Sequence, residues 1–117
     1  MDDYKMRIFE DIRKQIKDIY SINYPKHEMY GLQSQIRRAM VSVSLNIVEG
    51  NARCTSKDYR NFCYNARASL EEVNECLRIS KDLGYITDIN KFMEVNDSIG
   101  RQISSLINYL SSKIQNP

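Results

Sequence analysis

The stretch that decides the fold is residues 29–51, which read MYGLQSQIRRAMVSVSLNIVEGN. Its apolar side chains recur at steps of four, three and four residues, the spacing that places them on one face of an α-helix. They are Ile36, Met40, Val43 and Ile47. Pro25 ends the preceding segment, because proline disfavours helical geometry at the residue before it, and Gly50 suits a C-terminal cap region. The pattern therefore predicts a helix over residues 29–51.

The same periodicity predicts three more helices, at about residues 3–22, 56–83 and 88–115. Thr55 and Asp58 are spaced as a capping pair at the start of the third, and Gly84 is free to adopt positive φ at its end. Connections of four to six residues make neighbouring helices antiparallel. The sequence therefore predicts an all-α, antiparallel, up-down-up-down four-helix bundle that forms a single domain over residues 1–117.

The composition excludes several other classes of protein. The 117 residues include only four Gly and two Pro, too few for the many tight turns of a sandwich or barrel. The charged N-terminal residues lead into no apolar run, which argues against a signal peptide, and no apolar segment of about 18 residues is present to span a membrane. The three cysteines, an odd number, fit reduced thiols. We therefore expect a cytoplasmic protein with no membrane-bound segment.

The helix over residues 29–51 has more apolar surface than a monomeric bundle needs. With Ile36 at zero on a helical wheel, three further apolar residues fall at roughly 120–180°. They are Val41, Leu45 and Val48. One interpretation is that a second copy of the chain covers this oligomer face, so that the protein self-associates. The alternative is that the helix lies deep between two neighbours of its own bundle, and we favour self-association.

A polar stripe separates the two apolar faces of this helix, and a polar flank of the third helix can face it. The stripe and the flank carry Gln35, Arg38, Asn46, Glu49, Ser69 and Glu72. Amides, carboxylates and arginines on adjoining helices favour a charge-assisted hydrogen-bond network. One interpretation is a binding site, to which Arg53 also contributes. The other is an interface or a lock between paired helices, which we favour.

Asn96 is a polar residue among the core positions of the fourth helix, whose other members are apolar. A buried amide can fix the register of packed helices. It can also point to solvent where the end of a bundle splays, and we favour this second interpretation.

Basic residues concentrate in the middle of the chain, although the net charge is only +2. Residues 26–67 contain seven bases and three acids. The candidates for binding nucleic acid are Lys26, Arg37, Arg53, Lys57, Arg60 and Arg67. Tyr30, Tyr59 and Tyr64 are available to stack on bases or to pack. Two functions stay open: association with RNA or DNA, and a protein–protein interaction scaffold whose arginines are solvated or paired with carboxylates.

Residues that could carry catalysis are scarce. His27 is the only histidine and falls in a predicted loop, so the Glu-x-x-His pairs of a di-iron bundle are missing. The four glycines form no phosphate-binding loop, and no histidine can be placed beside a serine or cysteine nucleophile. We therefore expect no metal, no cofactor and no catalytic activity.

Several motifs of this chain are those of a known family. Residues 30–39 read YGLQSQIRRA and residues 46–50 read NIVEG, and the pattern continues in residues 66–72 (ARASLEE) and 83–86 (LGYI). Over about residues 5–112 the sequence resembles the four-helix bundle family of 23S rRNA intervening-sequence proteins. The same family includes the accessory protein of diversity-generating retroelements.

The resemblance implies a short all-α bundle that assembles as a homopentamer and has no catalytic activity. The accessory relatives bind nucleic acid and a reverse transcriptase, so the resemblance implies structured RNA or DNA, and a nucleic-acid enzyme such as a reverse transcriptase, as candidate partners. The intervening-sequence members are encoded within ribosomal RNA genes. The chain departs from the family pattern at four positions: Val48 replaces a small alanine, Ala52 and Ala68 replace glycine, and Asn74 replaces a glutamate.

Overall fold

The chain forms four long helices, as the sequence predicts. The structure, a computed structural model, describes residues 3–114. Its elements are α1 (Asp3–Tyr20), the 3-10 helix η1 (Lys26–Glu28), α2 (Leu32–Asn51), α3 (Ser56–Asp82) and α4 (Asn90–Lys113). The prediction of an all-α four-helix bundle is confirmed, and the predicted end of the last helix at residue 115 lies outside the described residues.

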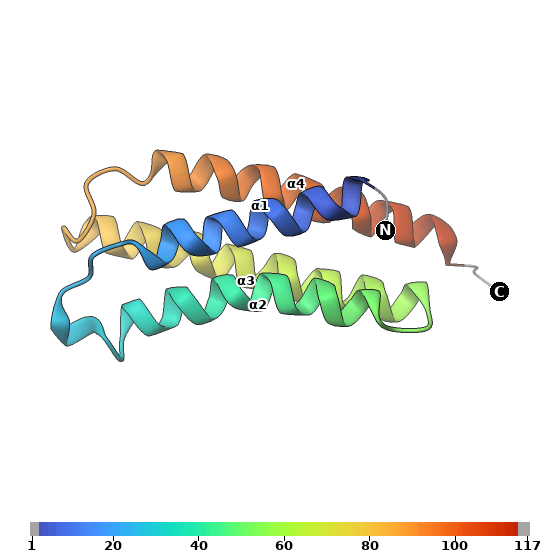
Figure 1. Cartoon of the computed structure of the whole chain (residues 1–117), viewed down its shortest axis with the longest axis horizontal. Helices are drawn as coiled ribbons and strands as arrows, with labels where there is room; N and C mark the ends of the chain where they lie inside the picture. The colour runs from blue at the N-terminus through green and yellow to red at the C-terminus, as the bar shows by residue number, and fades with distance from the viewer. Residues whose placement is uncertain (1–2, 115–117) are drawn as a thin grey trace.

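The helices alternate in direction along the 52 Å length of the molecule (Figure 1). α2 and α3 run side by side, and α1 and α4 lie above them in this view. Each helix packs against two neighbours: α1 on α2 and α4, and α3 on α2 and α4. One end of the bundle therefore holds η1 and the α3–α4 connection, and the other end holds the short α2–α3 turn.

Local hydrogen bonds set the helix boundaries. Thr55 Oγ1 accepts a hydrogen bond from the backbone N–H of Asp58 at 3.1 Å, which confirms the predicted cap of α3. Gly84 has a φ of 79° just after α3, a conformation that favours glycine, as predicted. α2 begins at Leu32, later than predicted, because the chain first forms η1 and the Glu28 carboxylate then accepts from the Leu32 N–H at 3.0 Å.

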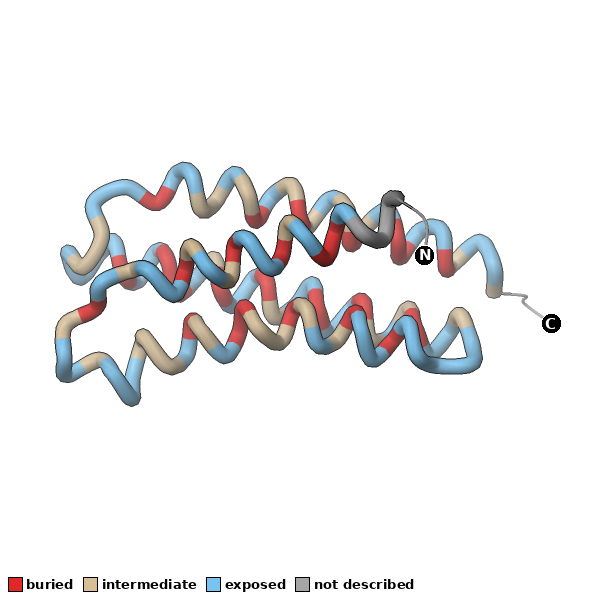
Figure 2. The backbone as a smooth tube through the Cα atoms, viewed as in Figure 1, coloured by how far each residue is buried: buried red, intermediate tan, exposed pale blue. Residues whose placement is uncertain are grey.

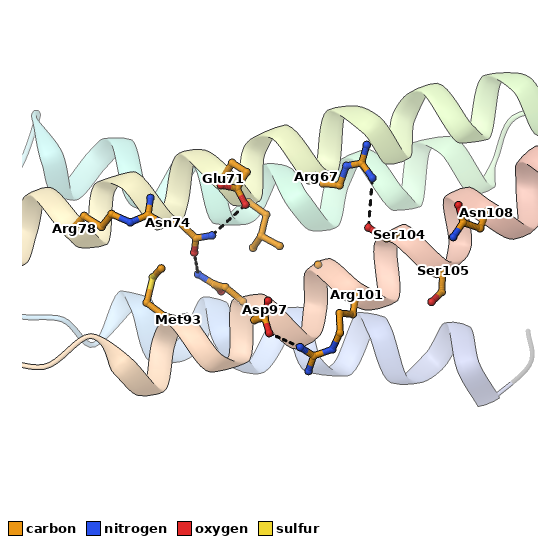
Figure 3. A pocket seen from close by; sticks show the side chains of 13 residues that line it. Arg67, Glu71, Asn74, Arg78, Met93, Asp97, Arg101, Ser104, Ser105 and Asn108 are labelled. Atoms are coloured by element: carbon orange, nitrogen blue, oxygen red, sulfur yellow. Dashed lines mark hydrogen bonds and ion pairs between the residues drawn. The ribbon is translucent and has the colours of Figure 1, made fainter.

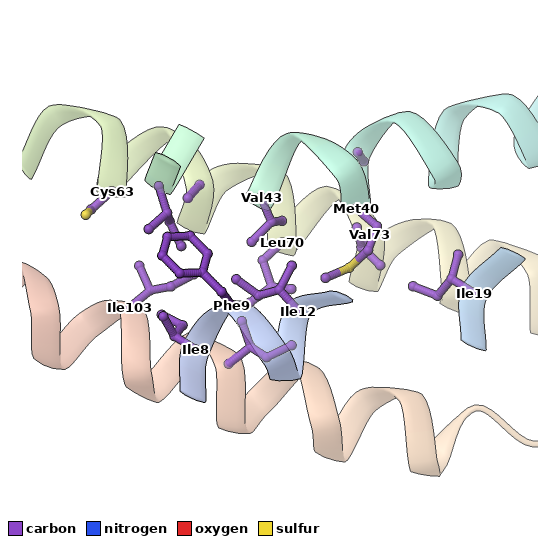
Figure 4. Close-up of a cluster of buried hydrophobic side chains, with 14 of the residues drawn as sticks. Ile8, Phe9, Ile12, Ile19, Met40, Val43, Cys63, Leu70, Val73 and Ile103 are labelled. Carbon is purple, nitrogen blue, oxygen red and sulfur yellow. The ribbon is translucent and has the colours of Figure 1, made fainter. Parts of the chain in front are cut away.

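Buried residues recur along each helix, as the red segments of the tube in Figure 2 show, and the apolar ones form one core cluster. Ile12, Met40 and Val73 from three different helices are each 0% exposed, and Figure 4 shows such side chains pointing toward one another. Burying an aliphatic side chain of this size contributes about 1.5–3 kcal/mol. Burial also raises the pKa of the Cys63 thiol to about 11, so Cys63 packs as an uncharged residue. No helix within residues 3–114 is long and apolar enough to span a bilayer.

Gly50 does not have the predicted role of a helix cap. It is a buried residue inside α2, at the point where α3 begins alongside. A Cβ atom here would lie 2.8 Å from both Phe62 Cβ and Tyr59 Cδ1, and 3.2 Å from the Tyr59 carbonyl oxygen. The glycine therefore lets α2 and α3 approach closely. The sequence placed Gly50 correctly near the C-terminal end of the helix, but it does not show how near the next helix lies.

The substitution Gly50→Ala is expected to lower the free energy of unfolding by about 1–3 kcal/mol, because the new methyl group overlaps Tyr59 and Phe62. This loss exceeds the ~1 kcal/mol by which alanine is favoured over glycine inside a helix. Urea denaturation followed by circular dichroism measures the change.

Gly100→Ala in α4 is the matched control, because its Cβ would first meet Leu70 Cδ2 at an ordinary 3.5 Å. This variant is expected to keep or raise the stability of the bundle. If both variants unfold at the same urea concentration, the close-approach role of Gly50 is wrong.

Candidate nucleic-acid interface

A polar groove runs between α3 and α4 (Figure 3). It has a volume of about 600 Å³, and both helices line it with arginines, carboxylates, amides and hydroxyls. The small residues Gly100 and Ser104 of α4 face Leu70 and Arg67 of α3, which leaves space between the two helices. The lining suits a charged or polar ligand rather than an apolar one.

Three arginines of α3 follow this side of the bundle, and we call Arg60, Arg67 and Arg78 the arginine row. Their spacing keeps them within about 20° of one another around the helix. Arg60 and Arg67 donate hydrogen bonds to serine hydroxyls of α4 at 3.2 and 3.4 Å, and their guanidinium groups lie 5.8 and 5.3 Å from the centre of the Tyr64 ring. Two of the residues predicted to bind nucleic acid therefore lie on one surface.

Sequence reasoning missed two arginines of the groove, Arg78 and Arg101. Both lie beyond residues 26–67, the stretch in which the basic residues of the sequence concentrate. The signal that reveals Arg78 is its distance from Arg67, which amounts to about three full helical turns. Arg101 has no such signal, because only the packing of α4 on α3 brings it to the groove.

Carboxylates balance part of the charge in the groove. Arg78 forms an ion pair with Glu75 at 3.4 Å, and Arg101 forms one with Asp97. Glu71 also lines the groove. Both ion pairs are exposed to solvent, so each contributes little to stability and can be broken by a competing anion.

The other four basic residues that were predicted to bind nucleic acid lie in two distant groups. Lys26 and Arg37 lie at the end of the bundle where α2 begins. Arg53 and Lys57 lie at the α2–α3 turn, where Arg53 pairs with Glu49 at 3.1 Å. Arg37 and Arg53 are about 24 Å apart along the helix axis, given 1.5 Å per residue. The structure therefore does not bring the six residues into one patch.

The predicted polar network between α2 and α3 is present in part. The hydroxyls of Ser42 and Ser69 lie 3.0 Å apart, and Asn46 Nδ2 donates to Ser42 Oγ at 3.0 Å. The Ser42–Ser69 contact connects the two helices halfway along their length, and the Asn46 bond lies within α2. Glu49 pairs with Arg53 instead, and the remaining predicted members, Gln35, Arg38 and Glu72, are exposed.

The predicted oligomer face of α2 points away from the rest of the bundle. Leu45 is 60% exposed and Val48 is 50% exposed, while Val41 is half-buried. The interpretation that α2 lies deep between two neighbours of its own bundle is therefore excluded for Leu45 and Val48.

Asn96 is buried, so the favoured interpretation that it points to solvent is wrong. Its Oδ1 accepts from Gln15 Nε2 at 2.8 Å, and its Nδ2 donates to Asn74 Oδ1 at 2.9 Å. Asn74 Nδ2 in turn lies 3.4 Å from Glu71 Oε1, at the groove. We call Gln15, Asn96 and Asn74 the amide chain; it joins α1, α4 and α3. No sequence pattern predicts the amide chain, because each amide bonds to a residue on a different helix.

His27 belongs to a cluster that joins the two connections at one end of the bundle. The Tyr85 hydroxyl donates to Glu28 Oε2 at 2.8 Å and lies 3.1 Å from His27 Nε2. Hydrogen bonds from the Leu32 N–H and from Tyr85 hold the pKa of Glu28 below its usual value, and the Glu28 carboxylate raises the pKa of Tyr85. In the described part of the chain, no three His, Cys, Asp or Glu side chains are grouped to hold a metal ion.

These features define the class of protein: an elongated, antiparallel four-helix bundle with an arginine-lined polar groove and an uncovered aliphatic helix face. Residues 4–105 match the model of the family described as 23S rRNA-intervening sequence protein. Because the match covers most of the chain, the chain belongs to this family. The resemblance found in the sequence is confirmed.

A solved structure from Bacteroides thetaiotaomicron has the same fold. It is a protein with unknown function from the S23 ribosomal protein family, and it is similar with a TM-score of 0.62 and 20% sequence identity. The similarity covers 93% of this chain and 99% of that chain, and at this identity it shows the fold alone. A comparison with curated proteins found no match.

The substitution Asn96→Ala is expected to lower the free energy of unfolding by about 1–3 kcal/mol, because Gln15 and Asn74 lose the partner that they share in the interior. Urea denaturation measures the loss. Asn65→Ala, on the exposed flank of α3, is the control and is expected to change stability by about 0.5 kcal/mol or less. Wild-type stability of Asn96→Ala would show that the amide chain does not hold the helices.

Proposed function

We propose that this protein is a non-enzymatic, self-associating helical bundle that binds the sugar–phosphate backbone of RNA or DNA. The observation that carries the proposal is the arginine row beside the α3–α4 groove. The row extends for about 27 Å along α3, which corresponds to the rise of about eight base pairs. A backbone that follows the groove therefore meets several guanidinium groups in succession.

The other groups of the groove suit the same ligand. Hydroxyls and amides of α4, among them Ser104 and Asn108, lie beside the row and can bond phosphate and sugar oxygens. Tyr64 lies between Arg60 and Arg67 and is 39% exposed. Such contacts carry no sequence information, so binding is expected to be insensitive to sequence and to weaken steeply with salt.

Self-association would strengthen nucleic-acid binding, which a single chain makes only weakly. Leu45 and Val48 support self-association, because a second copy of the chain removes their side chains from water. The pentamer of the resembling family members would carry about five times the formal charge of +2. Repetition of the groove makes the assembly multivalent, so a long strand can contact several copies at once.

A second candidate function is a protein–protein interaction scaffold with no nucleic-acid role. The observation that favours it is the partial neutralisation of the groove by Glu71, Glu75 and Asp97. In that case the assembled surface recruits a protein, such as a reverse transcriptase, and the charges act mainly in steering.

The double charge reversal Arg60→Glu with Arg67→Glu separates the two functions. It is expected to weaken binding of a fluorescent RNA duplex at about 50 mM salt by at least tenfold, because it replaces two phosphate contacts with repulsion. The slope of affinity against salt is expected to fall as well. Fluorescence anisotropy over a salt series measures both quantities.

Arg7→Glu with Arg13→Glu is the matched control, since it makes the same change in net charge at exposed positions of α1. The control is expected to bind the duplex more tightly than the groove variant. Undiminished binding by the groove variant, or no binding by the unaltered protein, favours the scaffold.

The substitution Leu45→Asp combined with Val48→Asp is expected to dissociate the assembly into single chains, because it buries two carboxylates in an apolar contact. Both side chains are exposed in one chain, so the bundle itself is expected to stay folded. Sedimentation velocity at micromolar concentration measures the change. Tyr109→Asp on α4, where Tyr109 is 56% exposed, is the control. An unaltered protein that sediments only as a 13.7 kDa monomer would contradict self-association.

A further inference from the structure

A second hollow is lined by residues from the end of α1, the α1–α2 connection and the start of α2. Figure 1 shows this end of the bundle. The volume of the hollow is about 380 Å³. The residues that line it include Tyr20, Met29, Tyr30, Ser34, Arg37 and Arg38. We call it the α1–α2 hollow; neither the predicted polar network nor the arginine row explains its combination of aromatic and basic side chains.

The aromatic side of the hollow is unusually open to solvent. Tyr30 is 93% exposed, and Tyr20 and Met29 are each 44% exposed. The Tyr30 side chain forms no hydrogen bond with any residue in the described part of the chain. A ring in this position neither fills the core nor anchors a turn, so its free face is available to stack on a flat partner.

The basic side of the hollow is held in position before any ligand arrives. Arg37 Nη2 donates to the Tyr20 carbonyl oxygen at 3.1 Å, and the Arg37 guanidinium lies 4.5 Å from the centre of the Tyr20 ring. Arg38 is exposed and forms no ion pair within residues 3–114. No carboxylate is among the lining residues, in contrast to the α3–α4 groove. The hollow therefore complements an anion that lies beside a flat ring.

The nearest carboxylate of this connection is engaged elsewhere. Glu28 Oε1 accepts from the Leu32 N–H at 3.0 Å, and Glu28 Oε2 accepts from the Tyr85 hydroxyl at 2.8 Å. These two bonds fix the residues just before Tyr30 against the α3–α4 connection. The hollow is therefore preformed, and a ligand does not have to order this part of the chain when it binds.

We infer that the α1–α2 hollow binds an unpaired nucleotide of a single-stranded segment, with the base stacked on Tyr30 and its phosphate held by Arg37 and Arg38. This inference rests on the proposed function and adds a preference for single strands over duplexes, which the groove does not provide. The groove contacts a backbone in any form, whereas a base inside a duplex is already stacked and paired and is not available to Tyr30. The hollow therefore selects single strands over duplexes.

The test uses the full-length protein, a fluorescent ten-nucleotide oligoadenylate and an RNA duplex of the same length. Tyr30→Ala is expected to weaken binding of the oligoadenylate about tenfold and to leave duplex binding unchanged, because only the stacking contact is lost. Tyr109→Ala is the matched control, since it removes an exposed tyrosine from α4 and is expected to change neither affinity. Arg38→Ala is expected to weaken binding of the oligoadenylate. It is also expected to lower the slope of log affinity against log salt concentration by about one, because one phosphate contact is lost.

Three results overturn the inference. The first is unchanged oligoadenylate binding by Tyr30→Ala while the duplex still binds, which leaves the proposed function intact. The second is that inorganic polyphosphate competes equally well with the single strand and with the duplex. That result would mean that the hollow binds anions and does not recognise a base. The third is a shift of Tyr30→Ala toward smaller species in sedimentation, which assigns the hollow to a contact between copies. If the unaltered protein binds neither nucleic acid, the proposed function fails as well.

Discussion

The close approach of α2 and α3 is the constraint on which the rest of the structure depends. Gly50 admits Tyr59 and Phe62 to the surface of α2, and the hydroxyls of Ser42 and Ser69 meet at 3.0 Å halfway along the pair. The middle of the polar stripe of α2, at Ser42, therefore bonds to α3, and the core stripe of α2 packs against α1 and α3. What remains is the third side of α2, which faces away from the bundle and carries Leu45 and Val48.

Polar contacts add to the apolar packing between α3 and α4. The amide chain of Gln15, Asn96 and Asn74 fixes α1, α4 and α3 in one register, because a shift of any helix would leave a buried amide without a partner. Beside it, the small residues Gly100 and Ser104 of α4 leave space next to Leu70. The same arrangement thus specifies the fold and leaves a polar groove next to the arginine row.

Sequence patterns predicted the features that depend on one helix at a time. The four helices, their core stripes, the Thr55 cap and the positive φ of Gly84 follow from local spacing and turn chemistry. The features that depend on two helices were missed or misread. They are the close approach of α3 to α2 at Gly50 and the buried hydrogen bonds of Asn96. A helical wheel gives the direction of a side chain but not its position along the helix axis or its neighbour on the next helix. For this reason the wheel did not show that the six basic residues lie in separate groups, or that Arg101 reaches the groove.

The outward side of α2 is basic near the start of the helix and uncharged further along it. Residues 41–48 read VSVSLNIV and contain no charge, so a second copy can cover them without stripping water from an ion. The first turns of the same helix carry Arg37 and Arg38 beside Tyr30, and the hollow there offers no carboxylate to pair with them. Covering these guanidinium groups with an apolar surface would cost more free energy than it returns, whereas a phosphate both neutralises them and leaves its base free to stack. The charge pattern therefore supports the two proposals, self-association through the aliphatic half of α2 and nucleic-acid binding at its aromatic, basic start.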